Sequence, residues 1–409
     1  MISIKSEEVT PWRIVVLLIG TGVVSAFQVG KVPGVLPMLM TDLKLTLFMA
    51  SWVIAILNVI GAAAGVFMGG FADRIGYRRL IIAGLSLMTL GCLAGGYTSS
   101  TAVFFTSRFI EGVGYFFTAL SVPSLITRIA NPRDLHLILG FWGAYMPSGI
   151  AIMLFISPFV VDKIGWRGLW VLNGFICLIV LAAFAVSTTH LSERKRTMVK
   201  LSLYVSRTIK TMFTTPGPVL LALCFLCYAG QWMALMSFLP TFFIEEVGMG
   251  KEGAALWTVL AVLVNIPGNI SGGFLSHKNV PRWLVLSVAF VVIALITIGI
   301  YSREIPLTIR LFLCLAFSFI GGHIPGTLMA AVPFHSPGKE YIGASNGLLV
   351  QGSNTGTLLM APALAAVVSL FGGWHGAPVI FVASGLIGLF SSLAIGRLER
   401  KQRIGKMVS

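Results

Sequence analysis

Long apolar runs recur along the whole chain, and they constrain its fold more than any other feature. A helix needs roughly 20 apolar residues to cross the hydrocarbon core of a bilayer. Twelve runs have about this length or more, covering 14–38, 48–71, 80–98, 102–126, 137–160, 168–188, 217–243, 253–275, 284–301, 307–332, 342–370 and 377–396. Only 11% of the residues are charged, too few to cover a water-facing surface. The sequence therefore predicts an all-α membrane protein with twelve transmembrane helices.

The basic residues between the runs predict the orientation. If both termini lie on one side, 21 of the 29 lysines and arginines fall on that side and 6 on the other. The remaining two, Lys31 and Arg108, lie inside runs. Short loops rich in basic residues stay in the cytoplasm. We expect a multi-pass protein of the cytoplasmic (inner) membrane with both termini inside, and we interpret the net charge of +15 as a topology signal rather than as nucleic-acid binding.

A basic polar stretch at 189–213 divides the chain into a half at 1–188 and a half at 214–409. Each half holds six of the predicted helices. Within the linker, residues 201–213 mix apolar and basic side chains, which is typical of an amphipathic helix on a membrane surface.

The two halves also repeat each other in sequence. Gly65-Val-Phe-Met-Gly-Gly-Phe is matched 203 positions later by Gly268-Asn-Ile-Ser-Gly-Gly-Phe. A second echo joins Gly165-Trp166 to Gly373-Trp374. Parallel halves related by an axis along the membrane normal are a known transporter architecture. We therefore expect two pseudo-symmetric six-helix halves.

The loop after the second run reads Gly-Gly-Phe-Ala-Asp-Arg-Ile-Gly-Tyr-Arg-Arg from residue 69 to residue 79. It closely resembles the signature loop of the major facilitator superfamily. The resemblance implies that fold, transport by alternating access, and a role for this loop as a latch between the halves. The latch residues would be Gly69, Asp73, Arg74, Gly76, Arg78 and Arg79. A well-anchored basic turn is the alternative.

Two further motifs bear on the branch of the family. Arg108-Phe-Ile-Glu111-Gly112 and Gly165-Trp166-Arg167 resemble the cyanate and nitroimidazole type transporters, close to an organic-anion symporter branch. The segment Gly143-Ala-Tyr-Met-Pro-Ser-Gly149 partly resembles a motif of drug antiporters, although Met146 stands where that motif has glycine.

Charged residues within the apolar runs are the strongest candidates for function. Arg108 and Glu111 lie three residues apart, on one face of a helix, and Lys31 is a second cation within a span. Charges at this depth are costly and usually functional. The alternatives are a self-neutralised structural pair for Arg108 and Glu111, and a snorkelling side chain for Lys31. Two cations against one carboxylate favour an anionic ligand.

Polar and aromatic residues of other spans complete the candidate site, although for each amide a role in holding helices together is an equal alternative. The predicted substrate-binding residues are Lys31, Arg108, Gln28, Tyr115, Tyr145, Gln231, Trp232, Asn265 and Asn354. For proton coupling we expect Glu111 or His323.

These features predict a secondary active transporter for a small anionic organic solute, coupled to protons. The alternative is a drug or metabolite exporter of the same fold. We expect no enzyme, cofactor or metal, because the sequence has no phosphate-binding loop and no catalytic or metal-ligating cluster within the spans. Nothing resembles the filter of a channel. The expected partners are the solute, protons and the lipid bilayer, and the expected state is a monomer.

Overall fold

The computed structural model describes residues 10–189, 201–278, 280–338 and 341–408, and these residues form helices and connecting loops without a strand. The predicted all-α fold class is confirmed. The helices are α1 (Trp12–Gly30), η1 (Pro33–Val35), α2 (Leu36–Asp42), α3 (Leu47–Ala55), η2 (Ile56–Asn58), α4 (Val59–Ile75), α5 (Tyr77–Tyr97), α6 (Thr101–Ile129), α7 (Pro132–Gly143), α8 (Tyr145–Ser187), α9 (Leu201–Thr214), α10 (Pro216–Glu245), α11 (Lys251–His277), α12 (Arg282–Tyr301), α13 (Leu307–His335), α14 (Ile342–Leu370), η4 (Trp374–Gly376) and α15 (Pro378–Val408).

The number of membrane crossings follows from the length of α8. Within the described residues, 11 helical segments are long and apolar enough to span a membrane. One of them is α8, whose 43 residues would extend over roughly 64 Å as one straight helix, about twice the hydrocarbon thickness. Its helix is interrupted at Gly165, which has a left-handed φ of 68°. Two crossings therefore lie within α8, and the total is the predicted twelve.

The fifth predicted span differs in detail from the observed helices. We predicted one helix at 137–160, whereas α7 ends at Gly143 and a new helix begins at Tyr145. Ala144 between them has φ −91° and ψ −5°, so the chain bends at the motif that resembles that of the drug antiporters. The apolar pattern continues through the bend, which is why the runs alone could not reveal it.

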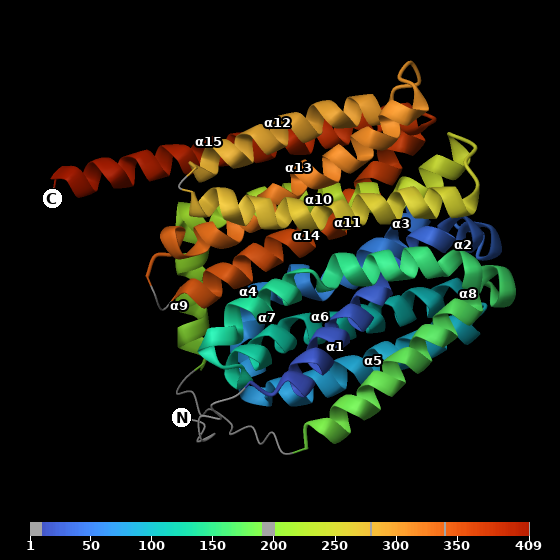
Figure 1. The fold of residues 1–409 in the computed structure, drawn as a ribbon, viewed down its shortest axis with the longest axis horizontal. Coiled ribbons are helices and arrows are strands. Elements are labelled where there is room, and N and C mark those ends of the chain that lie inside the picture. The colour runs from blue at the N-terminus through green and yellow to red at the C-terminus, as the bar shows by residue number, and fades with distance from the viewer. Residues whose placement is uncertain (1–9, 190–200, 279, 339–340, 409) are drawn as a thin grey trace.

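Two bundles lie side by side in Figure 1, one containing α1 to α8 and the other α10 to α15. In the first, α1 packs on α8 and α5 packs on both α6 and α8. In the second, α10 packs on α14, α11 on α13, and α12 on α15. Helix α9 crosses the end of the molecule at which α1 begins and α15 ends. We call this the linker end and the opposite one the far end.

The halves meet through a pair of equivalent contacts. Helix α4, in the second span, packs on α14 of the other half, and its counterpart α11 packs on α8. Glycine permits the first approach, since a Cβ at Gly65 would lie 2.7 Å from the Cβ of Gln351. The amide of Gln351 donates to the carbonyl of Ala62 over 2.8 Å. The predicted repeat thus corresponds to a symmetric interface.

The Gly-Trp echo has a structural counterpart at the far end. The indole Nε1 of Trp166 donates to the Asp42 carboxylate over 2.8 Å. In the second half, the Trp374 side chain hydrogen-bonds the Glu245 carboxylate. Asp42 and Glu245 are 203 positions apart, the offset of the sequence repeat. We call each pair a tryptophan clasp, and each joins the end of the first span of its half to the turn between the fifth and sixth spans.

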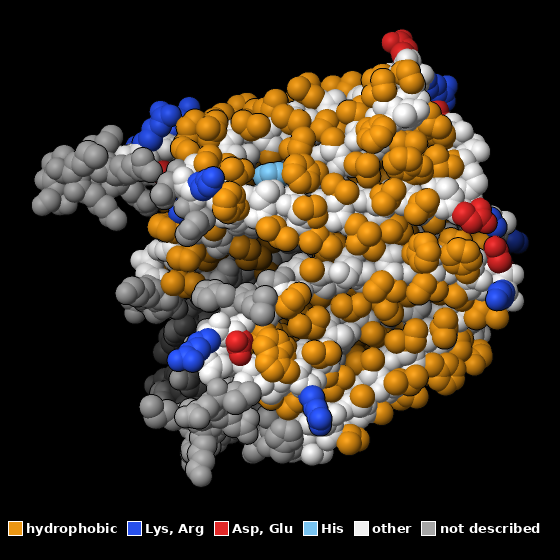
Figure 2. All heavy atoms as spheres, viewed as in Figure 1, with side chains coloured by type: hydrophobic (Ala, Val, Ile, Leu, Met, Phe, Trp, Pro, Cys, Tyr) orange, Lys and Arg blue, Asp and Glu red, His pale blue; other side chains and the backbone are white. Residues whose placement is uncertain are grey.

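The exterior matches a lipid-embedded protein. Figure 2 shows hydrophobic side chains along the flanks of the bundles and most charged ones at the two ends. Large apolar side chains such as Ile179, which is 68% exposed, point outward without a protein partner to cover them. The surface in Figure 2 is hollowed between the halves toward the linker end.

Candidate functional site

Three charged side chains meet inside the first half, and none of them is accessible to solvent. The Lys31 Nζ lies 2.9 Å from the Glu111 Oε2, and the Arg108 guanidinium pairs with the same oxygen. Arg108 and Glu111 come from α6, and Lys31 lies directly after α1. We call these residues the buried triad. The one-face spacing of Arg108 and Glu111 was visible in the sequence, but the contact with Lys31 was not.

Polar and aromatic groups from three helices surround the buried triad. The Lys31 ammonium donates to the Gln28 Oε1 over 2.7 Å and contacts the Cys92 Sγ at 3.2 Å. It also lies 4.4 Å from the centroid of the Trp170 indole, which attracts a cation through its ring face. The Gln28 amide reaches the Cys177 Sγ at 3.4 Å. Lys31 is therefore held inside the bundle and does not snorkel to the bilayer surface.

The sequence analysis missed Trp170, Cys92 and Cys177 as parts of this site. All three fall in apolar runs, and hydropathy treats them as fillers. A tryptophan in a span can offer its ring to a cation, but the sequence does not say which cation would reach it. Their role follows only from the packing of α5 and α8 around the triad.

Arg108 also holds the backbone where two helices break. Helix α1 ends ahead of η1, which contains Pro33, and α3 changes into the 3₁₀ turn η2. Such breaks release carbonyls from the regular helical pattern. The Arg108 Nη2 donates to the Gln28 carbonyl over 3.0 Å, and its Nε donates to the Val53 carbonyl over 3.2 Å. One buried side chain thus joins the broken parts of the first and second spans.

The buried triad carries a net formal charge of +1 when each group has its ordinary charge. Among the described acidic residues, Glu111 alone is fully buried. Its Oε2 pairs with both cations, whereas its Oε1 has no hydrogen-bond partner among the described residues. An uncompensated charge away from water is costly, so the site favours the approach of an anion.

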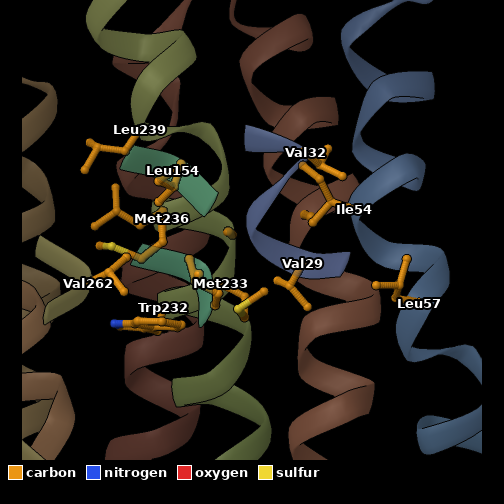
Figure 3. Packing of buried hydrophobic residues seen from close by; sticks show 14 of the residues in the cluster. Val29, Val32, Ile54, Leu57, Leu154, Trp232, Met233, Met236, Leu239 and Val262 are labelled. Carbon is orange, nitrogen blue, oxygen red and sulfur yellow. The ribbon is translucent and has the colours of Figure 1, made fainter. Parts of the chain in front are cut away.

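Apolar side chains of both halves meet beside the triad (Figure 3). Val29 and Val32 come from the end of the first span, and Ile54 and Leu57 from the second. They face Met233 and other residues of the second half, and all are at most 9% exposed. The layer comprises Val29, Val32, Ile54, Leu57, Leu154, Trp232, Met233, Met236, Leu239 and Val262. We call it the apolar seal. Because Val29 and Val32 flank Lys31 in the sequence, the apolar seal lies next to the triad.

An aromatic wall lies one helical turn from the triad toward the linker end. Tyr115 follows Glu111 by four residues on α6, and its hydroxyl lies 3.4 Å from that of Tyr145. Tyr145 stacks on Trp142 with the ring centroids 4.1 Å apart. The Trp142 ring in turn packs against Gly22 of α1. The structure thus brings the predicted residues Tyr115 and Tyr145 together.

A chain of amides and hydroxyls occupies the second half. The Asn269 amide donates to the Asn265 Oδ1, and the Asn265 amide donates to the Tyr228 hydroxyl, each over 2.9 Å. The same Asn265 amide donates to the Ser318 carbonyl, also over 2.9 Å. The Trp232 indole donates to the Ser318 Oγ. Asn265 and Trp232 therefore belong to one network, which also contains Tyr228 and Ser318.

The other predicted site residues lie elsewhere. The Gln231 amide donates to the Phe381 carbonyl, which directs it toward α15. Asn354 donates to a carbonyl of its own helix and packs over Gly61 of α4. His323 bonds Ser271 at 3.0 Å and packs edge-on against Phe319, an exposed side chain on the same face of α13. The structure does not bring His323 into contact with the buried triad.

The signature loop lies at the linker end. Gly69, Asp73 and Arg74 belong to α4, but their side chains lie outside the described residues. Gly76 has a φ of 99° and starts the turn into α5, as its position in the motif predicts. Arg78 donates to Thr188 and to the Ala185 carbonyl at the end of α8, and Arg79 is exposed. These contacts of Arg78 stay within the first half, so the latch between halves remains a prediction.

No group of three or more His, Cys, Asp or Glu side chains that could hold a metal ion occurs in the described part of the chain. The five cysteines are free and buried. The chemistry available at the site is therefore charge pairing, hydrogen bonding and proton exchange.

The similarity of this chain to known proteins agrees with its architecture. The family model described as Major Facilitator Superfamily matches residues 18–360. The chain is 26% identical over 311 residues to the "Nitrite extrusion protein" of Bacillus subtilis, covering 75% of each chain. It is 22% identical over 370 residues to the "Probable nitrate transporter NarT" of Staphylococcus epidermidis, covering 90% of this chain and 92% of the relative.

Solved structures show the same fold. A bacterial homologue of the human lysosomal transporter Spinster, inward-facing and unoccupied, superposes with a TM-score of 0.75 at 15% identity, covering 94% of this chain and 96% of that one. A D-xylose-proton symporter gives a TM-score of 0.74 at 15% identity, covering 94% and 97%. With twelve spans in two repeated halves and a family match over most of its length, this chain belongs to the Major Facilitator Superfamily and is a membrane transporter, not an enzyme.

Proposed function

We propose that this protein is a secondary active transporter that moves a small anion across the cytoplasmic membrane by alternating access, coupled to protons. The observation that carries the proposal is the buried triad, in which two cations share one carboxylate beside the apolar seal. An anion bound next to the triad would compensate the remaining positive charge without leaving a second charge unpaired.

The aromatic wall and the amide network suit such a ligand. Tyrosine hydroxyls and asparagine amides can donate hydrogen bonds to anion oxygens. Tyr115, Tyr145 and the Asn265 network lie in different halves, so an anion held between them would contact both. Contacts with both halves are what a substrate needs to couple its binding to their relative movement.

The relatives narrow the choice of anion. Two of them carry names that refer to nitrite and nitrate. We therefore propose a small monovalent anion of this size, either an inorganic oxyanion or a short carboxylate. The drug exporter of the same fold remains the competing proposal, and the bend at Ala144 within the segment resembling the antiporter motif is the observation that favours it.

We further propose that the linker end faces the cytoplasm and that the protein acts as a monomer. Most basic residues belong to segments at the linker end, as the positive-inside rule requires. The hollow between the halves opens toward the same end. The structure would then represent a state that is sealed at the far end and open to the cytoplasm.

Counterflow in proteoliposomes tests the transport proposal. Vesicles loaded with unlabelled nitrate or nitrite should accumulate the ¹⁵N-labelled anion, and Arg108→Gln should lower the rate at least tenfold. Lys210→Gln removes a positive charge from an exposed position on α9 and should exchange at the wild-type rate. Size-exclusion profiles of both variants report on folding. Wild-type rates in Arg108→Gln, or exchange of organic cations instead of anions, would contradict the proposal.

A further inference from the structure

We propose that Lys31, rather than Glu111 or His323, is the residue that carries the coupled proton. The inference rests on the proposed transport of an anion and assigns the proton to one atom, the Lys31 Nζ. It follows from the charges that the structure encloses together and from the hydrogen bonds available to each group.

Of the three charged side chains in the triad, only Lys31 can change its protonation state without leaving an unpaired buried charge. The Arg108 guanidinium does not lose its proton in proteins. Protonation of Glu111 would leave two buried cations without a counter-charge, because its Oε2 serves both Lys31 and Arg108. Loss of a proton from Lys31 instead leaves a neutral Arg108–Glu111 pair. Burial of all three side chains makes the neutral outcome the favourable one when no anion is present.

A neutral Lys31 amine keeps its hydrogen bonds. It can still donate to the Gln28 Oε1 at 2.7 Å and to the Glu111 Oε2 at 2.9 Å. Its lone pair can accept from the Cys92 thiol, whose Sγ is 3.2 Å away, once that thiol turns from the Gln28 Oε1 to which it donates over 3.1 Å. The ammonium form would instead use the Trp170 ring face at 4.4 Å. Both forms of Lys31 therefore find partners in the same position, and neither requires the helices to separate.

The groups that face Lys31 are few. Helix α6 contributes Glu111 and Arg108, α5 contributes the Cys92 thiol, and α8 contributes Trp170 and Cys177, whose thiol interacts electrostatically with Lys31. On its own segment, Gln28 is the polar neighbour. His323 lies in the other half, where it hydrogen-bonds Ser271 and the carbonyls of Phe319 and Ile320.

Anion binding and proton uptake are then linked. When an anion arrives, Lys31 accepts a proton, the N–H bond forms, and a hydronium ion becomes water. When the anion leaves, that N–H bond breaks, and a water molecule entering the vacated site takes the proton as a hydronium ion. By reciprocity, protonated Lys31 must bind the anion more tightly than neutral Lys31 does. One proton would accompany each monovalent anion, so that the cycle moves no net charge.

Hydrogen bonds to the backbone connect the buried triad to the apolar seal. Arg108 donates to the carbonyls of Gln28 and Val53, and the next residues in each chain segment are Val29 and Ile54 of the seal. A change of charge at Lys31 alters how strongly Glu111 holds Arg108. Arg108 is thus a positioning residue that transmits the protonation state of Lys31 to the interface between the halves.

Fluorine NMR of the full-length protein labelled with 5-fluorotryptophan tests the proposal without a ligand. The Trp170 signal, identified by its loss in Trp170→Phe, should shift with pH as the ammonium beside its ring forms. Lys31→Gln should abolish this shift, and His323→Asn should leave it unchanged. A Trp170 signal that is constant between pH 5 and pH 9, or that titrates equally in Lys31→Gln, would overturn the assignment.

Two further measurements separate this inference from the proposed function. Addition of nitrate to the wild-type protein should move the midpoint of the Trp170 titration to higher pH. In proteoliposomes, the ratio of accumulation driven by a pH gradient to counterflow should fall in Lys31→Arg and should keep its wild-type value in Lys210→Gln, which changes an exposed position on α9. A titrating Trp170 signal that nitrate does not move would reject nitrate as the substrate while leaving Lys31 as the proton carrier. A wild-type ratio in Lys31→Arg would overturn the role of Lys31.

Discussion

Removal of the single carboxylate from the buried triad should cost far more stability than removal of one of its cations. Glu111→Gln is nearly isosteric, so it removes charge without opening a cavity. With 2.9 Å between the Lys31 Nζ and the Glu111 Oε2, the attraction is roughly 6 kcal/mol at an effective dielectric constant of about 20 when Lys31 carries its proton. Mutational experience with buried ion pairs suggests a loss of about 3–5 kcal/mol. Lys31→Gln leaves the Arg108–Glu111 pair intact and should cost much less.

The assay is thermal unfolding of purified protein in detergent at pH 6, followed by the loss of the monodisperse size-exclusion peak. At about 2 °C per kcal/mol for a large chain, Glu111→Gln should lower the midpoint by about 6–10 °C. The double variant Lys31→Gln/Glu111→Gln relieves the repulsion between the two cations and should unfold at an intermediate temperature. Equal losses in the two single variants, or a double variant less stable than Glu111→Gln, would refute the charge argument.

Two glycine predictions concern packing and backbone strain. Gly112→Ala should lower the free energy of unfolding by about 1–3 kcal/mol, because the added Cβ would lie 2.6 Å from the Leu57 Cα. Gly20→Ala is the matched control in the same thermal assay, since its added Cβ would meet nothing within 4 Å. Gly165→Ala should lower the free energy of unfolding by about 1–2 kcal/mol through the φ of 68° at this position alone, since the added Cβ would meet no neighbour. An unchanged unfolding midpoint would show that the backbone at the reversal within α8 is not strained by a side chain.

Much of the fold could be predicted because the bilayer imposes it. Each span must be a helix of a certain length, and hydropathy reports that length directly. The exceptions are bends inside apolar stretches. Gly165 reverses the chain without leaving a long polar loop, and Ala144 bends it within a continuous apolar run. Neither changes the composition, so neither is visible in a hydropathy pattern.

The candidate site was only partly accessible from the sequence. The spacing of Arg108 and Glu111 predicts a shared helix face, but the approach of Lys31 depends on how α1 packs against α6. Trp170 and Cys92 were hidden because their types are common in apolar helices. His323 illustrates the converse, since a titratable residue within a span looks functional until its helix face is known.

The tryptophan clasps determine how each half can move. Trp166 with Asp42, and Trp374 with Glu245, tie the far end of the first span in each half to a turn that would otherwise be free to shift separately. Each half then behaves as one lever. Two spin labels placed on either side of one clasp should keep a constant separation throughout the transport cycle. Any change in the distance between labels at the two different clasps would then measure the angle through which the halves rock.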